Sequence, residues 1–191
     1  MKILVACEYS GRVREAFRRG GHDAWSCDLV ESDDNFPHHF TGDVTPYLND
    51  DWDMVIAFPP CTHLASSGAK HFAKKIADGR QQEGIDFFML FTNLKAPMVA
   101  IENPIGIMSK RYRKPDQIIQ PYWFGDPFQK STCLWLKGLP ELQATNIVDK
   151  GEFYISPTGK RLPKWYSDNK SAKVRSMTFP GIAQAMADQW G

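Results

Sequence analysis

The sequence predicts an α/β fold in which helices cover both faces of a mostly parallel sheet. Two observations indicate this class. Short apolar runs typical of buried strands alternate with segments of helical spacing through residues 1–104, and each run ends in a turn that carries polar side chains. Such βαβ alternation is typical of parallel sheets with a helical layer on each side. Open sheets of this kind bind their ligands at the carboxyl ends of the strands.

The first predicted unit is strand, glycine turn and helix. Residues 2–7 form an apolar run that passes through Gly11 into a segment from Arg12, and apolar residues have i, i+3, i+4 spacing at Val13, Ala16 and Phe17. Gly20-Gly21 predicts the end of that helix. Residues 24–29 then read as a second strand that carries Asp28, and a polar loop is expected over residues 31–39.

The next two strands place a thiol and a carboxyl group at one edge of the sheet. Residues 54–57 predict a buried strand that leads directly into Phe58-Pro59-Pro60-Cys61-Thr62. After a mixed segment and an amphipathic helix over residues 81–94, a strand over residues 98–101 leads into Glu102-Asn103-Pro104. Neighbouring parallel strands would bring Cys61 and Glu102 into one cleft.

The chain beyond residue 104 is less regular. Prolines and aromatics interrupt it before a strand predicted over residues 131–136, a short strand and turn near residues 151–159, and a final helix over residues 182–190. Between them lies the main local concentration of cations, which is interleaved with Trp165 and Tyr166 and comprises Lys160, Arg161, Lys164, Lys170, Lys173 and Arg175. Such a segment is either a solvated face or a nucleic-acid patch.

Composition limits the protein classes. With 191 residues, one domain spanning residues 1–191 is expected. Its 23 Lys and Arg balance 22 Asp and Glu, so any nucleic-acid-binding surface must be local. Four cysteines without a CxxC pair, and no apolar stretch near the roughly 20 residues of a membrane helix, predict a reduced, cytoplasmic protein. His63 and His71 near Cys61 do not make up the four ligands of a zinc site, so no metal is expected.

The order of these motifs resembles the cytosine-5 DNA methyltransferase family, which uses S-adenosylmethionine on a Rossmann-like sheet. Glu8-Tyr9-Ser10-Gly11 resembles the first motif, which holds the methionine part of the donor, and Asp28 falls where an acidic residue binds its ribose. Gly42-Asp43-Val44 resembles the adenine motif and Phe179-Pro180-Gly181-Ile182-Ala183 the last motif. Pro59-Pro60-Cys61 matches the nucleophile motif and Glu102-Asn103-Pro104 the acidic motif.

The resemblance implies roles for individual residues. Cys61 would add to carbon 6 of cytosine, and Glu102 would hydrogen-bond ring nitrogen 3 and the exocyclic amine. A free thiol has a pKa of about 8.5, so a helix terminus or a cation is expected near Cys61 to favour its thiolate. The donor-binding set is Glu8, Tyr9, Ser10, Gly11, Asp28, Asp43, Pro59 and Ile182. The nucleic-acid or substrate set is Pro60, Asn103, Gln129, Lys130, Lys160, Arg161, Lys164 and Arg175.

Departures from the family pattern leave other functions open. Val13 stands where the family has a second glycine, and the stretch from Lys130 to Cys133 lacks two family arginines, for which Lys130 would partly compensate. Only the short irregular insert 138–175 replaces the target-recognition region, so a partner chain could supply target recognition. The same chemistry on a free cytosine nucleotide or single-stranded nucleic acid is one alternative. A catalytically silent nucleic-acid-binding or regulatory relative is the other.

Overall fold

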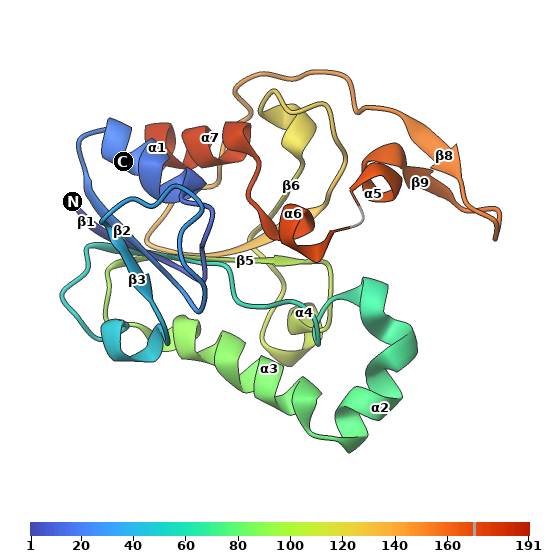
Figure 1. The fold of residues 1–191 in the computed structure, drawn as a ribbon, viewed down its shortest axis with the longest axis horizontal. Coiled ribbons are helices and arrows are strands. Elements are labelled where there is room, and N and C mark those ends of the chain that lie inside the picture. Colours follow the sequence, from blue (N-terminus) through green and yellow to red (C-terminus); the bar gives the residue numbers. More distant parts are fainter. Residues whose placement is uncertain (170) are drawn as a thin grey trace.

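A seven-stranded sheet forms the centre of the protein in a computed structural model that describes residues 1–169 and 171–191 (Figure 1). The strand order is β3-β2-β1-β4-β5-β7-β6. The first five strands run parallel to their neighbours, whereas β7 is antiparallel to both β5 and β6. The predicted α/β class with a mostly parallel sheet is confirmed. The strands are β1 (Lys2–Ala6), β2 (Asp23–Asp28), β3 (His39–Thr41), β4 (Met54–Ala57), β5 (Met98–Pro104), β6 (Gln117–Ile119) and β7 (Thr132–Lys137).

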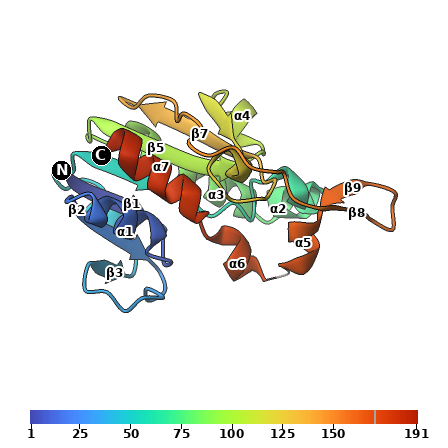
Figure 2. The same ribbon diagram turned by 90° about the horizontal axis from the view of Figure 1, so that it is seen from above.

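Helices cover both faces of this sheet. Helices α1 (Arg12–Arg19) and α7 (Pro180–Trp190) lie side by side over one face, and α3 (Arg80–Leu90) lies over the other (Figures 1 and 2). Side-chain alternation along β1 explains the two layers, because Ile3 and Val5 join the core beneath α1 and α7. Leu4 and Ala6 join the core beneath α3. Each strand buried on both faces therefore reads as a continuous apolar run.

The predicted boundaries agree closely with the observed elements in the first half of the chain. The strand over residues 54–57 is confirmed as β4, and the strand expected over residues 24–29 is observed as β2, one residue earlier at each end. The helix predicted over residues 81–94 ends earlier, at Leu90. Strand β5 continues to Pro104, so Glu102 lies within a strand rather than after it. The cause is the antiparallel ladder with β7, in which Glu102 pairs with Leu134 and Pro104 with Thr132.

Several short elements lie in segments expected to be loop or mixed. They include β3, which begins at His39 inside the predicted loop, and α2, which follows the thiol motif. These elements have three to six residues, too few for a periodic pattern to indicate them. The remaining elements are α2 (Phe72–Ala77), α4 (Met108–Arg111), α5 (Lys164–Asp168), α6 (Ala172–Ser176) and the 3-10 turns Thr45–Tyr47, Ser66–His71, Phe91–Asn93 and Pro121–Trp123.

The stretch 138–175 holds a small second sheet. Strands β8 (Phe153–Ile155) and β9 (Arg161–Pro163) pair antiparallel and extend away from the body of the protein (Figures 1 and 2). Lys170, one of the cations counted in this region, lies outside the described residues. Within the part of the chain that the structure describes, the helices are too short or too polar to cross a membrane.

Candidate active site

A cavity of about 510 Å³ lies at the carboxyl ends of β1, β2, β4 and β5. The strand order reverses here, since β2 lies on one side of β1 and β4 on the other. This is the position at which open α/β sheets bind ligands. We call it the central cavity; it is lined by Cys7, Glu8, Tyr9, Ser10, Asp28, Phe58, Pro59, Pro60, Cys61, Thr62, Glu102, Pro104, Lys130, Lys173, Arg175, Ser176, Met177 and Thr178.

More than half of the residues singled out in the sequence meet in this cavity. Both expected catalytic groups, Cys61 and Glu102, line it. The donor set contributes Glu8, Tyr9, Ser10, Asp28 and Pro59, and the substrate set contributes Pro60, Lys130 and Arg175. These residues come from segments up to 167 positions apart, which the sheet and α6 bring together.

The other expected site residues lie elsewhere. Gly11 lines a smaller hollow beside Arg12, and Ile182 lines a narrow space next to Glu102 and Lys130. Asp43 is exposed and accepts hydrogen bonds from the backbone and hydroxyl of Thr45. The side chain of Asn103 is buried. Gln129 and Lys164 line a second cavity of about 290 Å³. Lys160 and Arg161 are exposed on the hairpin formed by β8 and β9.

Cys61 follows β4 with a half-buried side chain. Its carbonyl accepts hydrogen bonds from the Leu64 and Ala65 amides at 3.0 and 2.9 Å, which fold the chain into a tight turn. Burial and the nearby Glu102 carboxylate raise the pKa of the Cys61 thiol, and the Lys130 and Lys75 ammonium groups act in the opposite direction. Two cations are therefore close enough to favour the thiolate, although burial prevails.

Glu102 lies on β5 with its side chain half-buried. Burial raises the pKa of this carboxyl group, while Lys130 and the hydroxyl of Thr132 lower it. A raised pKa favours the protonated acid, which can donate a hydrogen bond to a ring nitrogen. Lys130 thus influences both reactive groups, and its ammonium is held by a 2.8 Å hydrogen bond to the Arg175 carbonyl.

A buried hydrogen bond fixes the two motifs relative to each other. The side-chain amide of Asn103, which is 1% exposed, donates to the Pro59 carbonyl at 2.7 Å. Pro59 lies two residues before the thiol and Asn103 directly follows Glu102. This bond therefore couples the turn that carries Cys61 to the strand that carries Glu102.

In the part of the cavity formed by the first predicted motif, Glu8 caps α1. Its carboxylate accepts the backbone amides of Val13 at 2.7 Å and Arg14 at 3.3 Å, together with the Ser10 hydroxyl at 3.1 Å. An acidic group at this position satisfies helix N-terminal amides and complements the helix dipole. Gly11 precedes the helix with a φ of 68°, a left-handed conformation that favours glycine.

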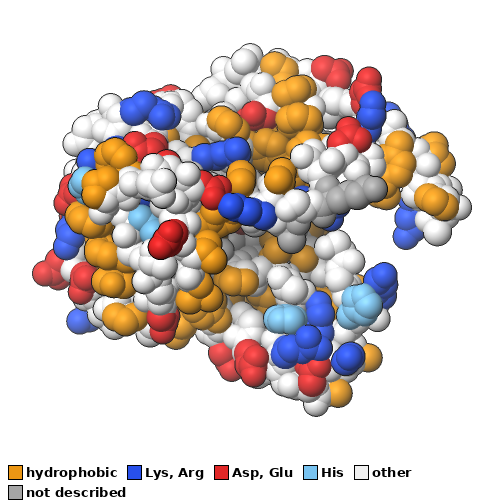
Figure 3. All heavy atoms as spheres, viewed as in Figure 1, with side chains coloured by type: hydrophobic (Ala, Val, Ile, Leu, Met, Phe, Trp, Pro, Cys, Tyr) orange, Lys and Arg blue, Asp and Glu red, His pale blue; other side chains and the backbone are white. Residues whose placement is uncertain are grey.

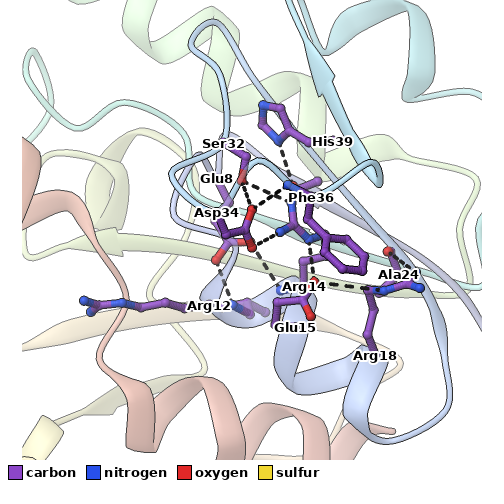
Figure 4. A network of polar contacts seen from close by, with 12 residues as sticks. Glu8, Arg12, Arg14, Glu15, Arg18, Ala24, Ser32, Asp34, Phe36 and His39 are labelled. Carbon is purple, nitrogen blue, oxygen red and sulfur yellow. Dashed lines mark hydrogen bonds and ion pairs between the residues drawn. The ribbon is translucent and has the colours of Figure 1, made fainter.

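Arg14 supports the turn next to the cavity, a structural role that the sequence interpretation missed. Its side chain is fully buried beneath the turn and donates to Ser26 at 2.8 Å and Ser32 at 3.3 Å (Figure 4). It also pairs with Glu15 at 3.0 Å and with Asp34. The guanidinium thus ties α1 and β2 to the loop that follows Asp28. A cation on a short amphipathic helix gives no sequence signal of such burial, because its partners are distant.

The sequence also missed residues that complete the walls of the cavity. Cys7 directly precedes the first motif and adopts a left-handed φ of 60°, which is rare for a residue other than glycine. The segment 173–178 lines the cavity from the opposite side, and the Tyr9 hydroxyl donates to the Lys173 carbonyl at 2.6 Å. Lys173 also pairs with Asp33 at 2.7 Å. Proximity to Glu8 could have indicated Cys7. In the segment 173–178 the sequence had indicated Arg175, but it gave no signal for Ser176, Met177 and Thr178.

Comparison with known proteins relates the fold to methyltransferases. No protein-family model matches the chain. No curated protein matches it either. Among solved structures, one similar chain is assigned as a DNA modification methyltransferase encoded within a prophage (E. coli), with 19% identity and a TM-score of 0.53. Another is the Entamoeba histolytica methyltransferase EhMeth, with 16% identity and a TM-score of 0.54.

The similarity covers most of this chain but only part of the other two. It covers 77% of this chain and 51% of the prophage-encoded protein, and 79% of this chain and 57% of EhMeth. This chain therefore matches little more than half the length of either structure. At these identities the comparison shows only that the fold is shared. The chain has a Rossmann-like fold similar to that of these two methyltransferase structures.

Proposed function

We propose that the protein transfers a methyl group from S-adenosylmethionine to carbon 5 of cytosine in DNA, through a transient bond between Cys61 and carbon 6. The observation that carries the proposal is that Cys61 and Glu102 line the same cavity as Glu8, Tyr9 and Asp28. A nucleophile, an acid and a candidate donor pocket therefore face one volume. Similar folds in a DNA modification methyltransferase and in EhMeth support it.

The donor side of the central cavity suits S-adenosylmethionine. Its volume of about 510 Å³ is in the range of cavities that bind small ligands. Asp28 lies at the end of β2 and can accept hydrogen bonds from ribose hydroxyls, while the ring of Tyr9 offers an apolar wall. When bound, the donor supplies an electrophilic methyl group on a sulfonium.

Cys61 performs the first step on the base. Carbon 5 of cytosine is a weak nucleophile, and addition of the Cys61 thiolate to carbon 6 moves electron density onto carbon 5. The thiol must lose its proton first, and Lys130 and Lys75 are the cations that oppose the effect of burial. Carbon 5 receives the methyl group, and S-adenosylhomocysteine is the other product. The carbon-5 proton then passes to solvent water and the carbon–sulfur bond breaks, which restores both the aromatic ring and the thiolate.

Glu102 stabilises the base during this addition. In its protonated form it donates a hydrogen bond to ring nitrogen 3, where negative charge develops as the thiolate adds. The raised pKa of the Glu102 carboxyl favours that form. In duplex DNA the target base must leave the stack to reach Cys61, at a cost of about a few kcal/mol.

Methyl transfer from tritiated S-adenosylmethionine tests this proposal. The acceptors are cytosine-containing duplex DNA, the same sequence as a single strand, and dCMP or dCTP. We expect label in the duplex at carbon 5 and at least about a 10³-fold loss in Cys61→Ser. Cys133→Ser, which changes a buried cysteine on β7, is the matched control and should retain activity.

Two other results would redirect the proposal. Label only in dCMP, dCTP or the single strand would assign the same chemistry to the alternative substrate. Absence of label in every acceptor, together with no heat of binding for S-adenosylhomocysteine, would favour the catalytically silent module. A Cys61→Ser protein with normal turnover would contradict the covalent mechanism.

A further inference from the structure

A buried lysine follows the thiol motif on α2. Lys75 is 8% exposed, whereas lysine side chains are rarely buried unless they are paired. Its neighbour Lys74 is exposed, and residues 61–77 contain no Asp or Glu. Figure 3 shows Lys or Arg and His side chains gathered over α2, beside a hollow that separates this part from β8 and β9. The segment therefore offers the buried ammonium no carboxylate of its own.

The Lys75 ammonium points back to the turn that carries the thiol. It donates to the carbonyl of Thr62, the residue after Cys61, at 2.5 Å. A Cβ placed on Gly68 would lie 3.3 Å from the Lys75 Nζ and 3.6 Å from the Thr62 carbonyl oxygen. Glycine at position 68 thus leaves the room in which the ammonium reaches this carbonyl. The hydrogen bond closes residues 62–75 into a loop and joins α2 to the turn at Cys61.

The charge of Lys75 has no carboxylate partner among the residues that the structure describes, because the ion pairs found there do not include it. An ammonium has three N–H donors, and the Thr62 carbonyl accepts one of them. A buried charge without a counter-charge is unfavourable, so an anion that forms close to it is stabilised. The Cys61 thiolate is such an anion, since the Lys75 ammonium acts to lower the pKa of that thiol.

Other charged or titratable groups also act on the thiol or share its cavity. Glu102 on β5 raises the pKa of Cys61, Lys130 lowers it, and the thiol in turn raises the pKa of Tyr166 in α5. The remaining charged side chains of the central cavity are Glu8, Asp28, Lys173 and Arg175. Lys130 also lowers the pKa of Glu102, together with the Thr132 hydroxyl. Of the two lysines that act on Cys61, Lys75 is therefore the one whose effect is selective for the thiol.

We propose that Lys75 is a positioning residue for Cys61, which fixes the turn after the thiol through the Thr62 carbonyl and holds a buried positive charge beside the thiolate. The inference rests on the proposed function for the reaction that this thiolate performs. It assigns part of the activation of the nucleophile to α2, an element outside the expected set of site residues.

Iodoacetamide alkylation of the Cys61 peptide across pH, followed by mass spectrometry, tests the role of Lys75. Lys75→Met removes the charge and keeps most of the side-chain volume, and we expect the midpoint of alkylation to rise by about one pH unit. The matched control is Lys74→Met, which removes the same charge from the exposed neighbouring position. Its midpoint should stay within about 0.2 pH units of the wild type, because solvent and salt screen exposed charges.

Two further variants separate the charge from the hydrogen bond. Lys75→Gln can still donate to the Thr62 carbonyl but carries no charge, so its midpoint should rise as in Lys75→Met. Lys75→Arg keeps both a charge and a donor, and its midpoint should rise by less than half as much. Urea denaturation shows which variants fold, and Lys75→Gln carries the test if Lys75→Met does not fold.

Three results would each overturn the role of Lys75. They are an unchanged midpoint in the uncharged variants that fold, an equal rise in Lys74→Met, and a rise in Lys75→Arg as large as that in Lys75→Gln. The first would show that the charge does not reach the thiol, the second that any nearby cation acts alike, and the third that the side chain acts by its shape alone.

The pH profile of methyl transfer adds a readout that a purely structural role would not move. At neutral pH, kcat of Lys75→Met should fall about three- to tenfold, because the thiolate fraction falls about tenfold while the more basic thiolate is more nucleophilic. The loss should shrink as the pH rises, and KM for S-adenosylmethionine should not change. A loss of the same size at every pH would contradict the assigned role.

The two measurements fail separately. Midpoints that move as expected, without methyl transfer to any acceptor by the wild type, would overturn the proposed function and leave the effect of Lys75 on the thiol standing. Methyl transfer by the wild type, with midpoints that do not move in the Lys75 variants, would overturn the role of Lys75 and leave the proposed function standing.

Discussion

The two sides of the central cavity are built differently. The donor side, formed by Glu8, Asp28 and the loop that follows β2, is held by buried polar groups around the fully buried side chain of Arg14 (Figure 4). The acceptor side, formed by Pro60, Cys61, Glu102, Lys130 and Arg175, lies on strand ends, turns and the short helix α6. A fixed donor side suits a constant small molecule, whereas an acceptor side that carries cations suits an anionic partner.

The largest effect on catalysis short of removing the thiol is expected at Glu102. Glu102→Gln keeps the shape of the side chain and can still donate a hydrogen bond, but its amide cannot transfer a proton to ring nitrogen 3 as negative charge develops there, so turnover should fall about 10²–10³-fold. Steady-state rates of methyl transfer give kcat, and calorimetry with S-adenosylhomocysteine should show donor affinity unchanged. A variant with full activity would contradict the assigned role of Glu102.

Breaking the buried network around Arg14 should lower the stability of the protein. Arg14→Met leaves Asp34, Ser26 and Ser32 without their buried partner, and we expect a loss of about 3–5 kcal/mol in the free energy of unfolding. Urea denaturation followed by circular dichroism measures it. The exposed control Arg19→Met on the same helix and the double variant Lys160→Ala/Arg161→Ala on the β8–β9 hairpin should stay within about 0.5 kcal/mol of the wild type. Equal stabilities for all three variants would contradict the stabilising role of the buried Arg14 network.

A comparison of Asp28 with Asp43 tests which of the two carboxylates contacts the donor. Asp28 lines the cavity and Asp43 is exposed with its hydrogen bonds satisfied by Thr45. Asp28→Asn should weaken S-adenosylhomocysteine binding about tenfold, as expected for a hydrogen bond to a charged group. Asp43→Asn should change it by less than about twofold. Calorimetry distinguishes them, and a larger effect at Asp43 would relocate the adenosine part of the donor.

The smallest expected effect is at Lys130. It is also the most specific, because Lys130 acts on the pKa of the Cys61 thiol. Its ammonium lowers the pKa of the thiol, so Lys130→Met should raise that pKa further and reduce the thiolate fraction at neutral pH. Iodoacetamide alkylation of the Cys61 peptide, followed by mass spectrometry across pH, should show its midpoint move upward. The conservative Lys130→Arg should restore much of the wild-type profile. A midpoint that stays in place or moves downward would contradict this role.

Much of the fold and the core of the site could be predicted because their signals are local. The apolar runs that became β1, β2, β4 and β5 each end near a motif, and parallel pairing of β4 with β5 follows from the helix between them. Cys61 and Glu102 thus reach one cavity although 41 positions separate them. The physical basis is that parallel strands place their carboxyl ends at one edge.

The remaining features depend on contacts between distant segments. Burial of Arg14 requires Ser26 on β2 and Asp34 in the following loop, so an amphipathic helix pattern predicts exposure instead. The extension of β5 to Pro104 requires the ladder with β7. The segment 173–178 reaches the cavity through Tyr9, 164 positions away from Lys173. No periodicity or turn signal in a single stretch could indicate these arrangements.

Covalent trapping at Cys61 tests the central claim most directly. A duplex with 5-fluorocytosine at the target position keeps the carbon–sulfur bond, because fluorine cannot leave carbon 5 as a proton does. With S-adenosylmethionine present, we expect a protein–DNA adduct whose peptide mass places the base on Cys61, and none in Cys61→Ser. Methyl transfer to cytosine without any adduct, or an adduct on Cys7 or Cys133, would contradict the account.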